Sequence, residues 1–246
     1  MFNRILAGID GSKNSLVASE YGIYLSKLLK RPVVGVHIVD VRLIEGAFFE
    51  DIAGALGFSE YDNLTEKVKE ALDQKGKVLL DIFAKECREK GGDCSIAQVF
   101  GIPHKELINL ADPEDLLIIG KHGQHKNLTQ LIFGTTADYI VKHSKCPVLL
   151  TDEIFKPIEN ITVFSQKEEV INFGLEFAKG LGLENIVLIN SKKEDYSEEK
   201  LNIDYVDLPL DCKDSIESYI EETQVDVLIT DKGNYKLQTK VNLLLK

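Results

Sequence analysis

The chain has 246 residues, of which 44% are hydrophobic and 28% are charged, and its net charge at neutral pH is −11. This composition is ordinary for a globular protein of one large or two modest domains, and the acidic balance argues against general nucleic-acid binding. No apolar run approaches the roughly 18 residues of a membrane span, so we expect no membrane protein, and the N-terminus has a strand pattern rather than that of a signal peptide.

Charged residues and cysteines are distributed in ways that bear on function. Residues 1–152 contain 18 basic and 21 acidic side chains, whereas residues 153–246 contain 11 and 19, so a polyanionic ligand is repelled less by the first part.

The cysteines are widely spaced and form no C-x-x-C motif (Cys87, Cys94, Cys146 and Cys212). We therefore expect reduced thiols in a cytoplasmic protein rather than a metal site or a disulfide framework.

The beginning of the chain has the pattern of a strand, a helix and a second strand. The apolar stretch Arg4–Ile9 predicts a strand that ends in the glycine turn Gly8–Ser12. A helix follows to about Lys30, capped by one of three polar residues at its start (Ser12, Asn14 or Ser15). Val33–Val39 predicts the second strand, and a series of this length is a right-handed βαβ unit.

Residues 42–60 form a glycine-punctuated apolar segment, for which two interpretations stay open. It is either a flap folded onto its own domain, which we favour, or a lid over a ligand or a partner surface. A long helix is predicted at Asn63–Lys90 with Gly76 as a candidate interruption, then a strand at Ser95–Phe100 and a helix at Pro103–Ala111. The apolar side of the long helix is predicted to carry Leu64, Val68, Leu72, Leu79, Ile82, Phe83 and Cys87.

The stretch Leu116–Thr136 carries the strongest functional signal. It opens with a short apolar run that ends abruptly at glycine, which is typical of a strand buried on both faces of a parallel sheet. Glycine turns follow at Gly120–Gly123 and at Gly134, where backbone N–H groups can approach a ligand without interference from a Cβ atom. Thr135 or Thr136 is predicted to cap the next helix. Glycine turns and a helix N-terminus at the carboxyl end of a parallel strand predict a phosphate site.

After a strand at Pro147–Thr151 and a linker at Asp152–Asn160, the sequence repeats this plan in shortened form. The predicted elements of the second copy are strands at Asn160–Ser165, Asn185–Asn190, Tyr205–Leu210 and Val225–Thr230, and helices at Glu168–Gly180 and Asp214–Glu222. Asp231–Asn234 stands where the glycine turn belongs, so this copy is not expected to hold phosphates. We expect a last strand, Val241–Leu245, to pair with Pro147–Thr151 and to join the copies as a pseudo-dimer within one chain.

Two standard nucleotide motifs are missing from the sequence. The turn Gly120–Gly123 is not a P-loop, because no G-K-[ST] ends it, and no G-x-G-x-x-G follows the first strand. Asp10 lies inside the first turn and is either a helix cap or a contact for a ribose hydroxyl, an adenine amine or a cation. His37 is interpreted as a core residue and His122 as a loop residue.

These residues resemble the universal stress protein family over Asn3–Thr151. The resemblance rests on six segments, which are Ala7–Ser12, His37–Asp40, Gly101–His104, Gly120–Gly123, Gly134–Thr135 and Cys146–Leu150. ATP-binding members of the family carry G-x2-G-x9-G-[ST], whereas ten residues separate Gly123 from Gly134 here, and the extra residue is expected in Gln124–Asn127. The second copy resembles the family only in the order of strands and helices.

The resemblance implies an α/β fold of two tandem parallel-sheet sandwich domains, similar to the adenine nucleotide alpha-hydrolases. Residues 1–152 would form a nucleotide-binding domain and residues 153–246 a reduced, degenerate second domain. Asp10 matches the residue that contacts ribose or adenine, and the backbone of Ile38 matches the position that reads the adenine edge. The positions implied to bind nucleotide are Gly8, Ile9, Asp10, Ile38, Ile119, Gly120, Lys121, His122, Gly123, Gly134, Thr135 and Thr136.

The function implied is that of a cytoplasmic adenine-nucleotide-binding sensor or switch in the stress response, with ATP, ADP or AMP as ligand and Mg²⁺ carried by the nucleotide. Lys121 and His122 are expected to add charge beside the phosphates. No residue set supplies a convincing base for phosphoryl transfer, so no catalytic or metal-ligating residue is assigned and ATP hydrolysis is expected to be slow at most. The alternative is a scaffold or interaction protein of the same fold without nucleotide. Homo-oligomers are expected as well, whereas nucleic-acid and membrane partners are not.

Overall fold

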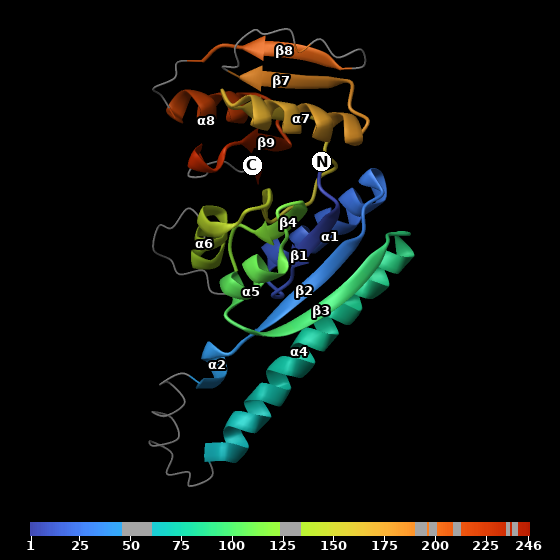
Figure 1. Ribbon diagram of the computed structural model, residues 1–246, viewed down its shortest axis with the longest axis vertical. Helices are drawn as coiled ribbons and strands as arrows, with labels where there is room; N and C mark the ends of the chain where they lie inside the picture. Colours follow the sequence, from blue (N-terminus) through green and yellow to red (C-terminus); the bar gives the residue numbers. More distant parts are fainter. Residues whose placement is uncertain are drawn as a thin grey trace.

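Figure 1 shows a computed structural model of the chain, which describes residues 1–45, 61–123, 134–189, 196, 201–208, 213–234, 237 and 241–246. Strands and helices are interspersed along these residues and the sheet is largely parallel, so the predicted α/β class is confirmed. In the same residues, no helix is both long and apolar enough to cross a membrane. We refer to residues 1–152 as the first half and to residues 153–246 as the second half.

The described strands form one sheet of ten strands, and every neighbouring pair is parallel except one. The strands are β1 Arg4–Gly8, β2 Val33–Asp40, β3 Cys94–Gly101, β4 Asp115–Gly120, β5 Val148–Thr151, β6 Ile161–Phe164, β7 Asn185–Ile189, β8 Asn202–Val206, β9 Val227–Thr230 and β10 Asn242–Leu245. Their order across the sheet is β3-β2-β1-β4-β5-β10-β9-β6-β7-β8. The antiparallel pair is β5 with β10.

Helices cover both faces of the sheet. They are α1 Lys13–Leu29, α2 Arg42–Glu45, α4 Tyr61–Glu89, α5 Pro103–Leu110, α6 Thr135–His143, α7 Glu168–Gly180 and α8 Lys213–Glu222, with a short 3₁₀ helix, η1, at Lys232–Asn234. One hydrophobic core contains side chains of α1, α4 and α7, such as Phe83 and Phe177, and the other contains side chains of α5, α6 and α8, such as Leu107 and Ile140. Helix α4 lies along β2 and β3 (Figure 1). Each core includes residues of both halves, so the two halves share their interior.

Local signals explain where α1 and α4 begin, end or continue. Ser12 caps α1, because its side chain accepts a hydrogen bond from the N–H of Ser15 (3.2 Å). Lys30 ends α1 in the left-handed conformation, with φ 52°. The predicted interruption of α4 at Gly76 is wrong, because the helix continues through it. Glycine is needed there, since a Cβ atom would collide with His37 of β2.

The antiparallel pair of β5 and β10 joins the last strand of the first half to the last strand of the second. Leu149 faces Leu244 across the pair, and all residues of both strands are buried. The pairing of Pro147–Thr151 with Val241–Leu245 predicted from the sequence is therefore confirmed. Outward from this pair, the strands follow corresponding orders, β5-β4-β1-β2-β3 on one side and β10-β9-β6-β7-β8 on the other. We call β5, β10 and the residues that flank them the junction.

Residues 152–160, predicted as a linker, contain no helix or strand and pack against α1. The hydroxyl of the fully buried Tyr21 donates a hydrogen bond to the carbonyl of Lys156 (2.8 Å). The same hydroxyl accepts a hydrogen bond from Nδ2 of Asn242 (2.8 Å), at the start of β10. One side chain of α1 thus holds both the linker and the junction.

Two further sequence predictions about the fold need correction. Ile82 does not lie on a buried face of α4, since its side chain is 53% exposed. The strand predicted at Tyr205–Leu210 begins earlier, at Asn202, because its register is set by pairing with β7, in which Asn185 faces Asn202. In the segment 42–60, helix α2 lies among the described residues, whereas 46–60 lies outside them, so neither interpretation of that segment is tested.

Replacing Tyr21 with Phe is expected to lower the free energy of unfolding by about 2 kcal/mol, because the carbonyl of Lys156 and the buried amide of Asn242 each lose a hydrogen bond. Tyr24→Phe is the matched control on the next turn of α1, where the hydroxyl accepts one hydrogen bond, from the N–H of Ile158 (3.1 Å). Its expected loss is about 1 kcal/mol. Urea unfolding measures the free energy lost in each variant, provided that the m-value stays the same as in the unmodified chain. Equal losses would contradict the role assigned to Tyr21.

Candidate functional site

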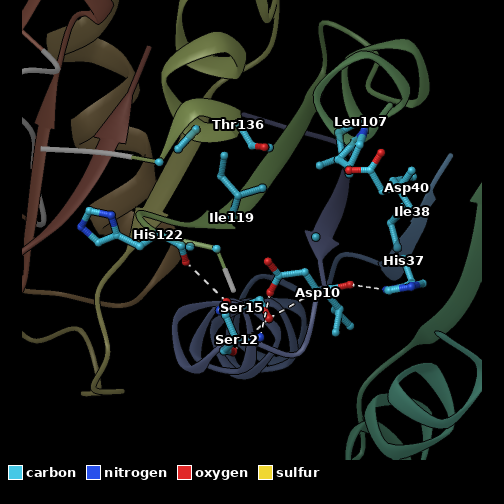
Figure 2. A pocket seen from close by; sticks show the side chains of 18 of the residues that line it. Asp10, Ser12, Ser15, His37, Ile38, Asp40, Leu107, Ile119, His122 and Thr136 are labelled. Carbon is cyan, nitrogen blue, oxygen red and sulfur yellow. Dashed lines mark hydrogen bonds between the residues drawn. The ribbon is translucent and has the colours of Figure 1, made fainter. Parts of the chain in front are cut away.

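A cavity of about 260 Å³ opens at the carboxyl ends of β1, β2 and β4. The strand order reverses direction at β1, which is where open parallel sheets bind ligands. The volume approaches the lower end of small-molecule sites, about 300 Å³. Figure 2 shows side chains from the β1–α1 turn, β2, β4 and α6 gathered around it. All the positions implied to bind nucleotide line this cavity, namely Gly8, Ile9, Asp10, Ile38, Ile119, Gly120, Lys121, His122, Gly123, Gly134, Thr135 and Thr136.

The turn after β1 fixes the carboxylate of Asp10. Its Oδ1 accepts a hydrogen bond from the N–H of Ser12 (2.8 Å), and Oγ of Ser15 accepts from the N–H of Asp10 (3.2 Å). Its Oδ2 lies 2.9 Å from the position that a Cβ atom on Gly123 would take. Because Ser12 is the cap of α1, the interpretation of Asp10 as the helix cap is wrong. The carboxylate instead lies beside the first glycine turn.

The end of β4 approaches α1 so closely that only glycine fits. A Cβ atom on Gly120 would lie 2.5 Å from Cβ of Asn14 and 2.9 Å from its carbonyl carbon. Asn14 is buried, and its Nδ2 donates a hydrogen bond to the carbonyl of Thr151 (3.3 Å), while Oγ1 of Thr151 donates to the carbonyl of Asn14 (3.1 Å). These bonds join α1 to β5 beside Gly120, and the N–H of Lys121 attaches the first glycine turn itself to the carbonyl of Thr151 (3.0 Å).

The second glycine turn begins α6. Gly134 is the N-cap, with φ −62° and ψ 153°, and its N–H donates a hydrogen bond to the carbonyl of Lys121 (2.8 Å). Thr135 and Thr136 are the first helical residues, so the predicted cap by a threonine is wrong. The first N–H groups of a helix have no partner within it and lie at the positive end of its dipole, so this end favours an anion.

The ten-residue spacing between Gly123 and Gly134 does not separate the two turns. A Cβ atom on Gly134 would lie 3.6 Å from the backbone nitrogen of Gly123 and 3.6 Å from Cα of His122. Residues 124–127, where the extra residue is expected, lie outside the described residues. The two turns form adjacent walls of one cradle.

The opposite wall is formed by β2 beyond the end of β1. The N–H of Ile9 donates a hydrogen bond to the carbonyl of Val36 (2.8 Å), where the pairing of the two strands ends. Nδ1 of the buried His37 lies 2.7 Å from the carbonyl oxygen of Ile9. If β1 and β2 continued to pair, the N–H of Ile38 would donate to this same oxygen. In a parallel strand, every second residue points both its N–H and its C=O toward the same neighbouring strand. Ile38 therefore directs its N–H and C=O past the end of β1, where the described residues supply no backbone partner.

Sequence reasoning missed cavity residues from three other helices. Leu72 and Lys75 come from α4, Arg42 from α2 and Leu107 from α5. Arg42 pairs with Asp40, at 2.6 Å. Burial raises the pKa of Asp40, but the hydrogen bonds from Arg42 outweigh burial and hold that pKa below its ordinary value. The position of Asp40 at the end of the second predicted strand was a sequence signal that it lies near the site. No such signal marks the residues of α4, which reach the cavity only through tertiary packing.

The side chains of Lys121 and His122 are directed differently from what the sequence suggested. Nζ of Lys121 donates a hydrogen bond to the carbonyl of Val241 (2.7 Å) and lies 3.3 Å from the Asp152 carboxylate. The ammonium group is therefore at the junction and not over the glycine turns. The imidazole of His122 points away from Asp10 (Figure 2).

The corresponding turn of the second half carries a carboxylate. The registers of β4 with β1 and of β9 with β6 place Asp231 at the position of Gly120 and Lys232 at that of Lys121. Oδ1 of Asp231 accepts a hydrogen bond from the N–H of Gly233 (3.1 Å). A carboxylate in this place repels phosphate, which supports the prediction that the second copy holds none.

Gly120→Ala is expected to lower the free energy of unfolding by about 2 kcal/mol, because the added methyl group overlaps the backbone of Asn14. Gly134→Ala is the matched control, since its Cβ would have no neighbour closer than 3.5 Å and its φ is −62°. Its expected change is within about 0.5 kcal/mol. Thermal unfolding of both variants checks the difference, and a larger loss for Gly134→Ala would contradict the geometry described.

Three comparisons relate the chain to known proteins. The model of the universal stress protein family matches residues 1–152. Universal stress protein MJ0577 of Methanocaldococcus jannaschii is 27% identical over 154 residues, which is 61% of this chain and 94% of that protein. The solved structure of MJ0577 superimposes with a TM-score of 0.51 at 25% identity, over 61% of this chain and 96% of its own.

A second solved structure is similar over both halves. A universal stress protein from Archaeoglobus fulgidus covers 100% of this chain and 98% of its own, with a TM-score of 0.70 at 14% identity, so that likeness shows the fold alone. Universal stress proteins have the adenine nucleotide alpha-hydrolase-like fold, as expected from the sequence. Because the family model matches more than half of the residues, this chain belongs to the universal stress protein family.

Proposed function

We propose that this universal stress protein binds an adenine nucleotide in the cavity of the first half and acts as a cytoplasmic sensor or switch in the stress response. The observation that carries the proposal is the convergence of two glycine turns and the N-terminus of α6 beside Asp10. Backbone N–H groups around such turns form an anion-binding concavity that needs no lysine-rich pocket. The resemblance of these motifs to those of ATP-binding family members supports adenine as the base.

The phosphates of ATP, ADP or AMP lie between the turns Gly120–Gly123 and Gly134–Thr136 in this proposal, and the ribose lies at Asp10. The base lies along β2, where the N–H and C=O of Ile38 match the acceptor and the amine donor on one edge of adenine. Guanine presents an acceptor in place of that amine and would face the carbonyl of Ile38. Mg²⁺ would arrive bound to the nucleotide phosphates.

We propose that residues 1–152 are the nucleotide-binding domain and that residues 153–246 are a degenerate second domain of a tandem pair. The corresponding strand orders on the two sides of the junction support this division. Asp231 in place of Gly120 supports the loss of nucleotide binding in the second domain.

Binding rather than rapid turnover is the proposed activity, with slow ATP hydrolysis at most. Asp10 is already held by the N–H of Ser12, and the imidazole of His122 points away from it, so this pair lacks the geometry of a base and its orienting group. The alternative is a scaffold of the same fold without nucleotide, which the more acidic second half favours.

ATP is expected to raise the unfolding temperature, because a ligand at 100 times its Kd adds about 2.7 kcal/mol of stability. GTP is expected to give a smaller shift than ATP. Gly134→Val fills the space between the carbonyl of Lys121 and the nitrogen of Gly123, so it is expected to remove the shift. Scanning calorimetry at millimolar nucleotide measures the three shifts in unfolding temperature, with ATP, with GTP, and with ATP in the Gly134→Val variant. No shift with ATP in the unmodified chain would contradict nucleotide binding and favour the scaffold.

Asp10→Asn is expected to weaken the binding of both adenosine and ATP about tenfold, because a charge-assisted hydrogen bond to the ribose becomes neutral. The amide oxygen of Asn can still accept from the N–H of Ser12, so the turn keeps its geometry. Isothermal titration calorimetry measures the two affinities. Stronger ATP binding in the variant would mean that Asp10 faces the phosphates, and the placement of the ribose would be wrong.

A further inference from the structure

Lys121 connects the two glycine turns through its backbone. It lies between Gly120 and Gly123, and its N–H donates a hydrogen bond to the carbonyl of Thr151 (3.0 Å). Its own carbonyl accepts a hydrogen bond from the N–H of Gly134 (2.8 Å). A displacement of Lys121 therefore moves both turns and separates them from β5.

The side chain of Lys121 reaches into the junction. The residue is 4% exposed, and its ammonium donates a hydrogen bond to the carbonyl of Val241 (2.7 Å) and lies 3.3 Å from the carboxylate of Asp152. Val241 immediately precedes β10, so this contact belongs to the second half. Burial lowers the pKa of the ammonium, and the Asp152 carboxylate opposes that effect. A buried ammonium is stable only while it keeps its partners, so the contact with Val241 restrains Lys121 strongly.

Lys232 makes the reciprocal contact from the second half. It occupies the position of Lys121 by register, and its ammonium donates hydrogen bonds to the carbonyls of Ser144 (2.7 Å) and Cys146 (2.9 Å), just before β5. The two lysines thus cross the junction in opposite directions. Lys232 follows Asp231, so it supports a turn that is not expected to hold phosphate. It provides a natural control for the role of Lys121.

We infer that Lys121 is a positioning residue through which the second half holds the two glycine turns of the first half in the arrangement that binds phosphate. This inference rests on the proposed function, since it concerns the same cavity. It gives the second half a role that does not require a nucleotide of its own. In this role Lys121 acts on the phosphate end of the ligand, and the adenosine end at Asp10 and Ile38 is supported by the first half alone.

The test compares Lys121→Met with Lys232→Met in the full-length chain. Both variants are expected to unfold at lower temperature, because each removes an ammonium that donates hydrogen bonds across the junction. Isothermal titration calorimetry with ATP and with adenosine separates their effects on the site. Lys121→Met is expected to weaken ATP at least tenfold while adenosine stays within twofold of the unmodified chain. Lys232→Met is expected to leave both affinities within twofold.

Two further variants address loss of folding. In Lys121→Arg the guanidinium still donates to the carbonyl of Val241, so the ratio of ATP to adenosine affinity is expected to return toward that of the unmodified chain. Asp152→Asn changes a side chain that is 34% exposed, and it is expected to weaken ATP a few-fold without unfolding the protein.

Each result decides between the inference and a merely structural role. ATP affinity within twofold in Lys121→Met, an equal loss of ATP and adenosine, or the same loss in Lys232→Met would overturn the inference while nucleotide binding stands. If the unmodified chain binds neither ATP nor adenosine, the proposed function falls, and this inference falls with it.

Discussion

The antiparallel contact between β5 and β10 is the interaction on which the rest of the structure depends. Without it, each half would expose the unpaired backbone groups of an edge strand whose residues, such as Leu149 and Leu244, are apolar. Pairing satisfies both edges and lets helices of the two halves cover continuous faces of one sheet. The cores are accordingly shared, as the contact of Phe2 with Phe177 shows, at 6.4 Å between ring centroids. Folding of either half is therefore coupled to that of the other.

The same contact links the fold to the candidate site. The turn after β4 lies next to the end of β5, and Asn14, Thr151 and Lys121 connect it to α1, to β5 and to the second half. His37 ends the pairing of β1 with β2 by taking the carbonyl of Ile9. The cavity thus exists because β1 and β2 stop pairing beyond Ile9, while the turn after β4 is held by hydrogen bonds to β5 and to the second half. Its polar recognition comes mainly from backbone groups, which explains how a site proposed for an anionic ligand arises in an acidic chain.

The sequence predicted those features that depend on local patterns. The apolar run before Gly120 identified β4, and the helix at Glu168–Gly180 matches α7 residue for residue. The nucleotide positions came from the family resemblance instead, and all of them lie around one cavity. Features set by distant contacts were missed. Leu72 and Lys75 reach the cavity because α4 packs along β2, and the ammonium of Lys121 is drawn to the junction, which no local pattern encodes. The prediction of a threonine cap for α6 was wrong, because the hydrogen bond from the N–H of Gly134 to the carbonyl of Lys121 places the glycine itself at the cap position.

The central claim is that the backbone amides of two adjacent glycine turns bind the phosphates of an adenine nucleotide. A titration of the ¹⁵N-labelled full-length chain with ATP, followed by amide NMR, tests it most directly. The account predicts the largest chemical-shift changes at Gly120–Gly123 and Gly134–Thr136, with Asp231–Asn234 unchanged. Changes confined to the second half, or no change at saturating ATP, would contradict it.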